Sequence, residues 1–224
     1  HHRTTFGQRL SDHALMRNVL ADLAIEAEAA IVLAMRVARA ADRAPYDAQE
    51  AAFARIATAV GKYWVCRRAP GFANEALECL GGAGYVEESM LPRLYRQAPL
   101  NSIWEGSGNI QCLDVLRALQ REPASVEAYI AELAPARGLH VDFDRVFAPL
   151  TATLHGGGIE ESASRGLVER MALALQGALL LRVASPVAEL FCRSRLGGQH
   201  GLGFGTLGGG QDLAGIVLRA MGGA

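Results

Sequence analysis

Apolar residues recur every three or four positions along much of the chain, a spacing that is typical of amphipathic helices. The clearest pattern predicts a helix from Asp12 to about Ala41, with Asp12 as its N-cap. One face of this helix carries Met16, Leu20, Leu23, Ala27, Ile31, Ala34 and Ala38. Pro45 is expected to end it, because proline disfavours helical geometry in the residue before it.

Three further helices are predicted in the first half of the chain. They cover about Asp47–Arg68, Asn74–Leu80 and Ser107–Gln120. Pro70-Gly71 is expected to end the first of them and Gly81-Gly82 the second, since glycine readily takes the left-handed conformation found after helices. The stretch from Tyr85 to Trp104 contains two prolines and short apolar groups, so we interpret it as a loop with at most one helical turn.

Beyond Glu122-Pro123 the composition shifts, but the helical spacing continues. Helices are predicted at about Ala124–Leu133, Phe143–His155, Glu160–Val183, Pro186–Arg195 and Asp212–Met221. No segment has the alternation of a strand, so the predicted fold class is all-α. Residues 1–121 are expected to form an antiparallel four-helix bundle, because their helices are long and joined by short breaks. Residues 122–224 are expected to form a smaller helical appendage.

The appendage contains a segment, 197–210, in which eight of fourteen residues are glycine. A phosphate-binding glycine loop needs a strand before it and a helix directly after it, and no strand is predicted here. We therefore interpret this segment as a flexible surface loop.

Composition and charge narrow the function classes. Half of the residues are apolar and 20% are charged, so the chain can bury a core. The net charge is −1, and Lys62 is the only lysine among 22 basic residues, which argues against a general polyanion binder. No apolar run reaches about 18 residues and no signal-peptide pattern opens the chain, so neither a membrane span nor secretion is supported. Because the first residue is His1 rather than methionine, we expect a piece of a longer polypeptide.

The four cysteines, Cys66, Cys79, Cys112 and Cys192, stand far apart and outside any metal-ligand spacing. Each lies in an apolar helical segment, where a free cysteine behaves as a small hydrophobic residue. We expect buried, reduced thiols and no metal site, and hence a cytoplasmic, reducing compartment.

Three local patterns are candidates for chemistry. Arg3-Thr-Thr-Phe-Gly7 places a cation and an aromatic ring on a turn, and the glycines of 80–85 let a ligand approach the backbone. The third pattern, 103–110, places Glu105 at the entry to a helix. If Glu105 is buried beside Trp104, it suits a general base near neutral pH, because burial favours the protonated carboxyl. The structural alternative is that Ser107 caps the helix and Glu105 lies in the favourable field at its start.

Taken in order, the three patterns resemble the C-terminal helical domain of the acyl-CoA dehydrogenase family. The matching residues are Arg3-x-x-Phe6-Gly7, Leu80-Gly-Gly-x-Gly84 and Glu105-Gly-Ser-x-Asn109-Ile110. The longer string from Leu91 to Ile110 is similar to the adaptive-response (AidB-like) branch, flavoproteins linked to the bacterial response to DNA alkylation. The resemblance is strong over residues 1–120 and looser beyond them.

The resemblance implies an FAD-dependent oxidoreductase that acts on acyl-CoA thioesters of fatty acid metabolism. In the family, a glutamate at the position of Glu105 removes the pro-R α-proton of the thioester while the β-hydride passes to flavin N5. The main-chain N–H of the same residue helps to bind the thioester oxygen, as in an oxyanion hole.

The remaining matched positions contact FAD in the family. They are Ser107 and Asn109 for the FAD of the same subunit, and Arg3, Phe6, Gly81, Gly82 and Gly84 for that of a neighbouring subunit. An arginine suits this task, since its fork can hold a pyrophosphate with two hydrogen bonds. A flavin shared across an interface implies a homo-dimer or tetramer.

Two positions depart from the family pattern, and two family domains are missing. Glu78 stands where the family usually has glutamine, and near Ala14 a further glutamine is replaced, which affects the adenine-side contacts. The family's N-terminal helical domain and middle β-domain, which carry most of the flavin and acyl-CoA pocket, are not in this sequence. We therefore expect the chain alone to bind FAD weakly or not at all, and to be inactive.

Two alternative functions stay open. One is an alkylation-response flavoprotein that contacts DNA and has little or no dehydrogenase activity. DNA affinity depends on cations, and residues 121–224 hold nine arginines, no lysine and ten acids. A weak DNA contact would need a stripe of arginines to gather in three dimensions, such as Arg117, Arg121, Arg193 and Arg195. The other alternative is a helical oligomerisation module with no site of its own.

Overall fold

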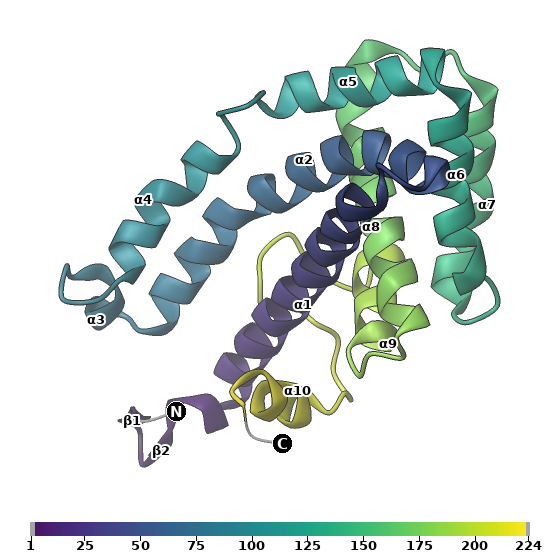
Figure 1. Cartoon of the computed structure of the whole chain (residues 1–224). Coiled ribbons are helices and arrows are strands. Elements are labelled where there is room, and N and C mark those ends of the chain that lie inside the picture. The colour runs from purple at the N-terminus through teal and green to yellow at the C-terminus, as the bar shows by residue number, and fades with distance from the viewer. Residues whose placement is uncertain (1–2, 223–224) are drawn as a thin grey trace.

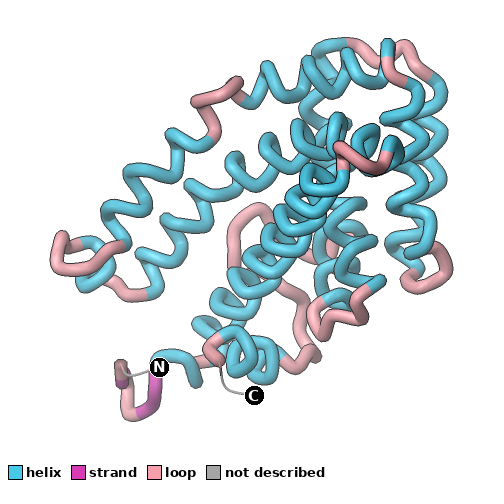
Figure 2. The backbone as a smooth tube through the Cα atoms, viewed as in Figure 1, coloured by secondary structure: helices cyan, strands magenta, loops and turns pink. Residues whose placement is uncertain are grey.

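The structure of the chain, a computed structural model, describes residues 3–222, which are mostly helical (Figure 1, Figure 2). The α-helices are α1 (Ala14–Arg43), α2 (Ala48–Cys79), α3 (Gly82–Tyr85), α4 (Leu91–Asn101), α5 (Gly108–Arg121), α6 (Pro123–Leu133), α7 (Val141–Gly156), α8 (Ser164–Arg182), α9 (Ala188–Phe191) and α10 (Leu213–Ala220). Short 3₁₀ turns occupy Leu10–Asp12, Ala134–Ala136 and Glu161–Ala163, and a π-helical turn occupies Cys192–Leu196. The strands β1 (Thr4–Thr5) and β2 (Gln8–Arg9) form an antiparallel hairpin. The all-α fold class is confirmed. Within residues 3–222, no helix combines the length and apolar character that crossing a membrane requires.

The longest helix, α2, continues through Pro70, so the predicted break at Pro70-Gly71 is wrong. Asp47 caps its start by accepting hydrogen bonds from the N–H groups of Gln49 and Glu50, at 3.0 and 3.2 Å. Proline removes one helical hydrogen bond and crowds the preceding turn. The helix tolerates this loss because α1, α4, α5, α6 and α8 all pack against it. The helices predicted over 47–68 and 74–80 are therefore one.

The segment predicted as a loop before Trp104 contains a regular helix, α4, so this prediction is also wrong. Pro92 lies in its first turn, where a helix needs no N–H donor, and Pro99 lies in its last turn. Only Pro92 occupies a position that a helix tolerates without cost, whereas Pro99 lies inside the helix, so neither proline marks a loop here. Figure 1 shows α4 and α5 running back along α2, which completes the helical bundle of residues 1–121.

The other predicted helices exist, with boundaries that differ by a few residues. His13 rather than Asp12 takes the N-cap position of α1, because Asp12 belongs to the preceding 3₁₀ turn. The helix predicted from Pro186 begins at Ala188 and changes into the π-helical turn. Asp212 caps α10 by accepting a hydrogen bond from the N–H of Gly215 at 3.0 Å.

One apolar core joins the two parts of the chain. Phe53 of α2 stacks on Tyr129 of α6, with 6.4 Å between the ring centroids. The Tyr129 hydroxyl donates a hydrogen bond to the carbonyl oxygen of Met171 in α8 at 2.6 Å. Buried residues of α1, α2 and α5 lie in the same cluster as those of α6, α7 and α8. The division into 1–121 and 122–224 stays a prediction about folding units, and apolar contacts cross it.

The glycine-rich segment 197–210 is a loop, but α1 anchors it. The Asn18 side chain forms two hydrogen bonds with the backbone of Leu207, at 3.0 and 3.1 Å, and the Leu207 side chain is buried. The N–H of Gly205 donates to the Asp22 carboxylate at 2.9 Å. The interpretation as a flexible surface loop is therefore wrong for 205–207, because composition alone does not reveal long-range anchors.

All four cysteines are free thiols, as expected. Cys112 and Cys192 are buried, but Cys66 and Cys79 are only partly buried, so the expected burial is wrong for these two. Burial raises the pKa of Cys112 to about 11 and that of Cys192 to about 12. The two buried thiols are therefore poor nucleophiles in the folded chain.

Candidate functional site

The turn between α4 and α5 presents Glu105 in a strained backbone conformation. Glu105 has a φ of +55°, in the left-handed region that favours glycine, and Gly106 follows with a φ of +103°. A non-glycine residue in this region costs about 1–3 kcal/mol and persists only where its surroundings hold it. Glu105 is exposed, and Trp104 beside it is 57% exposed. In this chain Glu105 is therefore not buried beside Trp104.

Side chains from two other elements hold this turn by its carbonyl groups. The Lys62 ammonium of α2 donates to the carbonyl oxygen of Trp104 at 2.7 Å and also to that of Gly106. The Gln111 amide of α5 donates to the carbonyl oxygens of Glu105 and Gly106 at 3.1 and 3.3 Å. Within residues 3–222, the main-chain N–H of Glu105 donates to no acceptor. Three successive carbonyls are therefore held, while the Glu105 carboxylate and N–H stay accessible.

Ser107 and Asn109 lie where α5 begins. Ser107 takes the N-cap position, as the structural alternative predicts, but its side chain forms no capping hydrogen bond. The Oδ1 of Asn109 accepts a hydrogen bond from Nε of Arg165, in α8, at 2.8 Å. A residue of the second part of the chain therefore contacts the Glu105 group, which consists of Glu105, Ser107 and Asn109.

A surface pocket of about 200 Å³ lies beside the Glu105 group. Ser107 and Asn109 line it together with three cationic residues, Lys62, Arg67 and Arg165. Its lining includes no carboxylate. The pocket is thus suited to an anionic group, because a cleft lined by one sign of charge attracts the opposite sign.

A second set of predicted residues meets at the far end of α2. Nη1 of Arg3 donates a hydrogen bond to the carbonyl oxygen of Leu80 at 2.6 Å. Gly81 has a φ of +59°, and a Cβ placed there would lie 3.8 Å from the Arg3 guanidinium. A Cβ on Gly82 would meet no atom within 4 Å, so this side of the turn is open. The sequence motifs at 3–7 and 80–84, far apart in the chain, are thus adjacent in space.

Phe6 and Gly84 have opposite environments. The Phe6 ring is 99% exposed, with its edge toward His13 at 6.2 Å between centroids. A large apolar ring held in water suits contact with another molecule. Gly84 is buried, and a Cβ there would lie 2.2 Å from the carbonyl oxygen of Leu77. Packing within the turn therefore requires a glycine at position 84.

These residues form two separate groups that lie near different parts of α2. The arm–turn group consists of Arg3, Phe6, Gly81, Gly82 and Gly84. An α-helical rise of 1.5 Å per residue places Leu80, which the arm–turn group contacts, about 27 Å along α2 from Lys62, which contacts the Glu105 group. The structure brings the members of each group together and keeps the two groups apart.

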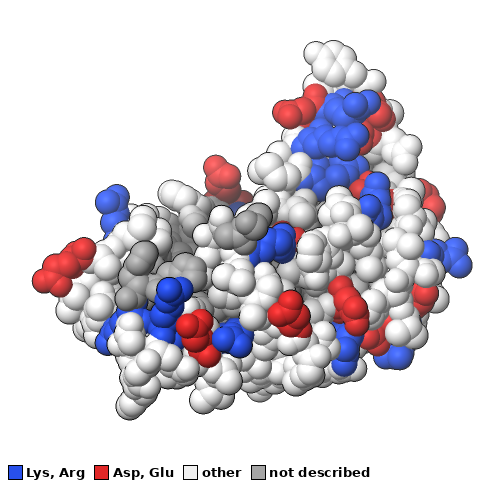
Figure 3. All heavy atoms as spheres, turned by 90° about the horizontal axis from the view of Figure 1, so that it is seen from below, with Lys and Arg blue, Asp and Glu red and all other residues white. Residues whose placement is uncertain are grey.

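On the face drawn in Figure 3, acidic and basic side chains are scattered, apart from one group of basic side chains that acidic ones border. Three members of the arginine stripe considered for DNA contact pair with carboxylates instead: Arg117, Arg193 and Arg195. The Arg195 side chain is also buried, with 6% of its area exposed. Arg195 is therefore not accessible to a DNA backbone, whereas the Arg117 side chain is 59% exposed.

Comparison with known proteins shows which family the chain belongs to. Residues 1–120 match the family model described as acyl-CoA dehydrogenase, C-terminal domain. The chain belongs to the acyl-CoA dehydrogenase family. The expected family is confirmed, and the family match contains both the arm–turn group and the Glu105 group.

The family relatives are considerably longer than this chain. The putative acyl-CoA dehydrogenase AidB of Escherichia coli K12 is 40% identical over 224 residues, which cover all of this chain and 40% of that protein. Human mitochondrial short-chain specific acyl-CoA dehydrogenase is 34% identical over 119 residues, 53% of this chain and 27% of that protein. The crystal structure of Caenorhabditis elegans ACDH-11 in complex with C11-CoA superposes with a TM-score of 0.74 at 26% identity, covering 87% of this chain and 37% of that one. The similarity to AidB thus extends through residues 122–224.

Three residues that contact the Glu105 turn or Asn109 are not predicted from the sequence: Lys62, Gln111 and Arg165. Lys62 and Arg165 lie on other helices, so no local motif connects them to position 105. The one available signal is that Lys62 is the only lysine of the chain. That count marks the residue as unusual but does not say what it contacts.

Proposed function

We propose that the full-length protein is an FAD-dependent, acyl-CoA dehydrogenase-like flavoprotein with Glu105 as its catalytic base. The observation that carries this proposal is the Glu105 turn, which holds an accessible carboxylate and a free N–H in a strained conformation. Relatives named as acyl-CoA dehydrogenases, and a similar structure determined with C11-CoA, support an acyl-CoA thioester as the substrate.

The residues of this chain fit a flavin dinucleotide. The pocket beside Ser107 and Asn109 carries cations but no carboxylate, which suits a pyrophosphate or its neighbouring hydroxyl groups. The arm–turn group adds an exposed guanidinium, an exposed aromatic ring and an open glycine turn. Together these features supply charge, stacking area and close backbone approach, which are the contacts that a dinucleotide needs.

In the proposed reaction, the Glu105 carboxylate accepts the α-proton of the thioester. The N–H of Glu105 donates to the thioester oxygen and stabilises the negative charge that develops on it as the proton leaves. FAD, when bound, supplies the acceptor for the hydride from the β-carbon. The left-handed backbone at position 105 lets one residue provide both the base and the N–H donor.

We further propose that the protein works as a homo-dimer or tetramer. The arm–turn group and the Glu105 group contact Leu80 and Lys62, which lie about 27 Å apart along the direction of α2. We infer that they contact two different flavin molecules, one belonging to each of two subunits. We also infer that this chain alone binds FAD weakly or not at all, since it spans 40% of the AidB relative. The free thiols favour a reducing compartment, and we propose a cytoplasmic location.

The flavin spectrum of the full-length protein tests the proposal. The protein is purified without added FAD and titrated anaerobically with a branched short-chain and a straight medium-chain acyl-CoA. We expect the main flavin absorbance band to bleach, and Glu105→Gln to abolish bleaching while FAD stays bound. Glu189→Gln, an exposed carboxylate on α9, is the matched control and should bleach as the wild type does.

A bound flavin that no thioester reduces would contradict the proposal. Such a result would favour the DNA-linked alternative or a helical oligomerisation module. Within residues 3–222, three of the four arginines considered for DNA pair with carboxylates, which does not favour the DNA-linked alternative.

A further inference from the structure

The Glu105 turn depends on the single lysine of the chain. We infer that Lys62, together with Gln111, is a positioning residue that fixes the backbone at Glu105; its consequence for catalysis rests on the proposed role of Glu105 as the base. Lys62 is placed on α2, far from the turn in sequence, and its side chain is partly buried.

The hydrogen bonds explain how one side chain fixes a strained residue. The carbonyls of Trp104 and Gly106 flank Glu105, and the Lys62 ammonium donates to both. An ammonium group has three donors and no acceptor, so it can hold two carbonyls at once. Rotation of Glu105 out of its left-handed conformation would reorient the adjoining peptides and break these bonds. Lys62 thereby opposes the relaxation that the strain at Glu105 favours.

Within this chain, burial contributes little to holding the turn, so the hydrogen bonds are its main support. Ile103, Trp104 and Ile110 are 60%, 57% and 54% exposed. The carbonyl oxygen of Glu105 accepts a hydrogen bond from the Gln111 amide. Donors from α2 and α5 therefore hold the carbonyls of Trp104, Glu105 and Gly106. The carboxylate and the N–H of Glu105 remain outside this set of bonds. Lys62 therefore orients the reacting groups of Glu105 through the backbone, because it contacts the flanking carbonyls and neither the carboxylate nor the N–H.

Amide hydrogen exchange on this chain tests the positioning role without any cofactor. In Lys62→Met, the ordered amides of the 102–111 peptide should exchange at least about tenfold faster, which corresponds to about 1.4 kcal/mol, near the lower end of the value of a hydrogen bond to a charged group. Lys62→Arg, which keeps a charged donor, should restore most of the protection. Peptides of α6 should be unchanged in every variant. Arg39→Met, which removes an exposed cation from α1, is the matched control and should leave the turn unchanged.

Steady-state kinetics of the full-length protein test the consequence. Lys62→Met should lower kcat by about tenfold to a hundredfold with little change in KM, since a displacement of about 1 Å of a reacting group costs this much. Lys62→Arg should recover part of kcat. Unchanged exchange in the 102–111 peptide, or a loosened turn with an unchanged kcat, would overturn the inference.

The inference and the proposed function can fail separately. If Glu105→Gln still permits flavin reduction, the proposed base is wrong, but the exchange result for Lys62→Met still stands. If Lys62→Met does not fold by circular dichroism, Gln111→Leu replaces it, because this variant removes the hydrogen bonds to the carbonyls of Glu105 and Gly106. Unaltered exchange in Gln111→Leu would then contradict the inference.

Discussion

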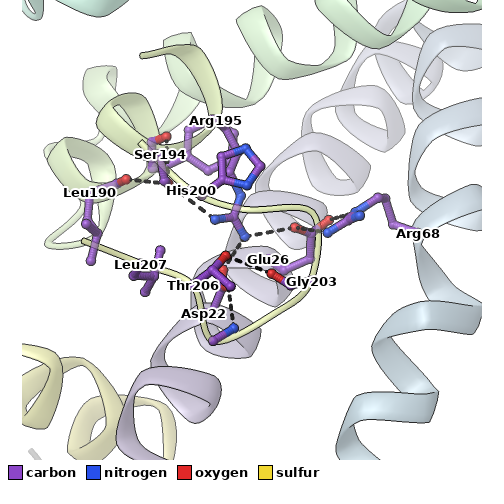
Figure 4. Close-up of polar contacts among 12 residues, drawn as sticks. Asp22, Glu26, Arg68, Leu190, Ser194, Arg195, His200, Gly203, Thr206 and Leu207 are labelled. Carbon is purple, nitrogen blue, oxygen red and sulfur yellow. Dashed lines mark hydrogen bonds and ion pairs between the residues drawn. The ribbon is translucent and has the colours of Figure 1, made fainter. Parts of the chain in front are cut away.

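Replacing Arg195 with methionine should strongly destabilise the chain. Arg195 belongs to the π-helical turn, and its side chain is 6% exposed. It pairs with Asp22, which is 2% exposed, and with Glu26 at 3.2 Å. Figure 4 shows the guanidinium between these two carboxylates of α1, with Arg68 of α2 on the far side of Glu26. The cluster ties the loop after α9 to both long helices.

The expected loss of stability follows from the partners that Asp22 and Glu26 keep after the substitution. Asp22 would keep the N–H of Gly205 as a donor but lose its cation, and Glu26 would keep Arg68 alone. Removing one partner of a buried ion pair typically costs about 3–5 kcal/mol. For a chain of this size, each kcal/mol lowers Tm by about 2–4 °C, so we expect a fall of about 6–20 °C.

The loss should also depend on pH. Burial by itself would raise the pKa of Glu26, but the hydrogen bonds and charges of Arg68 and Arg195 outweigh it and hold the pKa below its ordinary value. Such a carboxyl contributes stability that is present above its unfolded pKa, about 4.3, and is lost as the pH falls through the folded value. Removing Arg195 raises the pKa of Glu26 again. The difference in stability between wild type and variant is therefore full at neutral pH and shrinks below about pH 4.5.

Urea unfolding followed by circular dichroism at several pH values measures both effects. Arg193→Met is the control, because Arg193 lies two residues away in the same turn but is 35% exposed and 3.9 Å from Glu189. It should change the free energy of unfolding by no more than about 0.5 kcal/mol. The double variant Asp22→Asn with Arg195→Met should recover part of the loss. A cost below about 1 kcal/mol for Arg195→Met, or one that is the same in acid and at neutral pH, would refute this reasoning.

Three other outcomes can be measured on the same chain. Gly84→Ala should lower the free energy of unfolding in urea by about 1–3 kcal/mol, because its Cβ would collide with a carbonyl oxygen, whereas Gly82→Ala should stay within about 0.5 kcal/mol. Glu105→Gly should raise thermal stability by up to about 1 kcal/mol and Glu105→Ala should not, because only glycine relieves the left-handed strain. A thiol reagent with mass-spectrometric mapping should label Cys66 before Cys192; equal rates in the folded chain would contradict the burial of Cys192.

The sequence predicts the helices well where apolar spacing is regular and poorly where proline intervenes. The predictions for α1 and α5 differ from the structure by a few residues, because an apolar stripe and a short break define each of them. Pro70 and the prolines of α4 mislead for a common reason. The cost of proline in a helix is a few kcal/mol, which contacts from neighbouring helices can offset, and those contacts are not visible in a local window.

The candidate site divides in the same way between local and long-range information. The motifs place Glu105, Ser107 and Asn109 within a few residues, so their proximity can be predicted directly. The contact between Arg3 and the carbonyl of Leu80 is not predicted from the sequence, since the two residues lie 77 positions apart. The left-handed conformation of Glu105 is not predictable from its residue type, because glutamate favours other regions and Lys62 and Gln111 hold it there.

Residues 122–224 contribute to the site as well as to the core. Arg165 of α8 donates a hydrogen bond to Asn109, and Arg165 also lines the pocket beside the Glu105 turn. The match to the family model ends at residue 120, so this contact is an addition to the C-terminal domain that the family model describes. α8 itself is held by the buried hydrogen bond from Tyr129 to Met171. The orientation of Asn109 therefore depends on the packing of α6 and α8, and a change in this second part of the chain should alter the predicted flavin contact without touching residues 1–120.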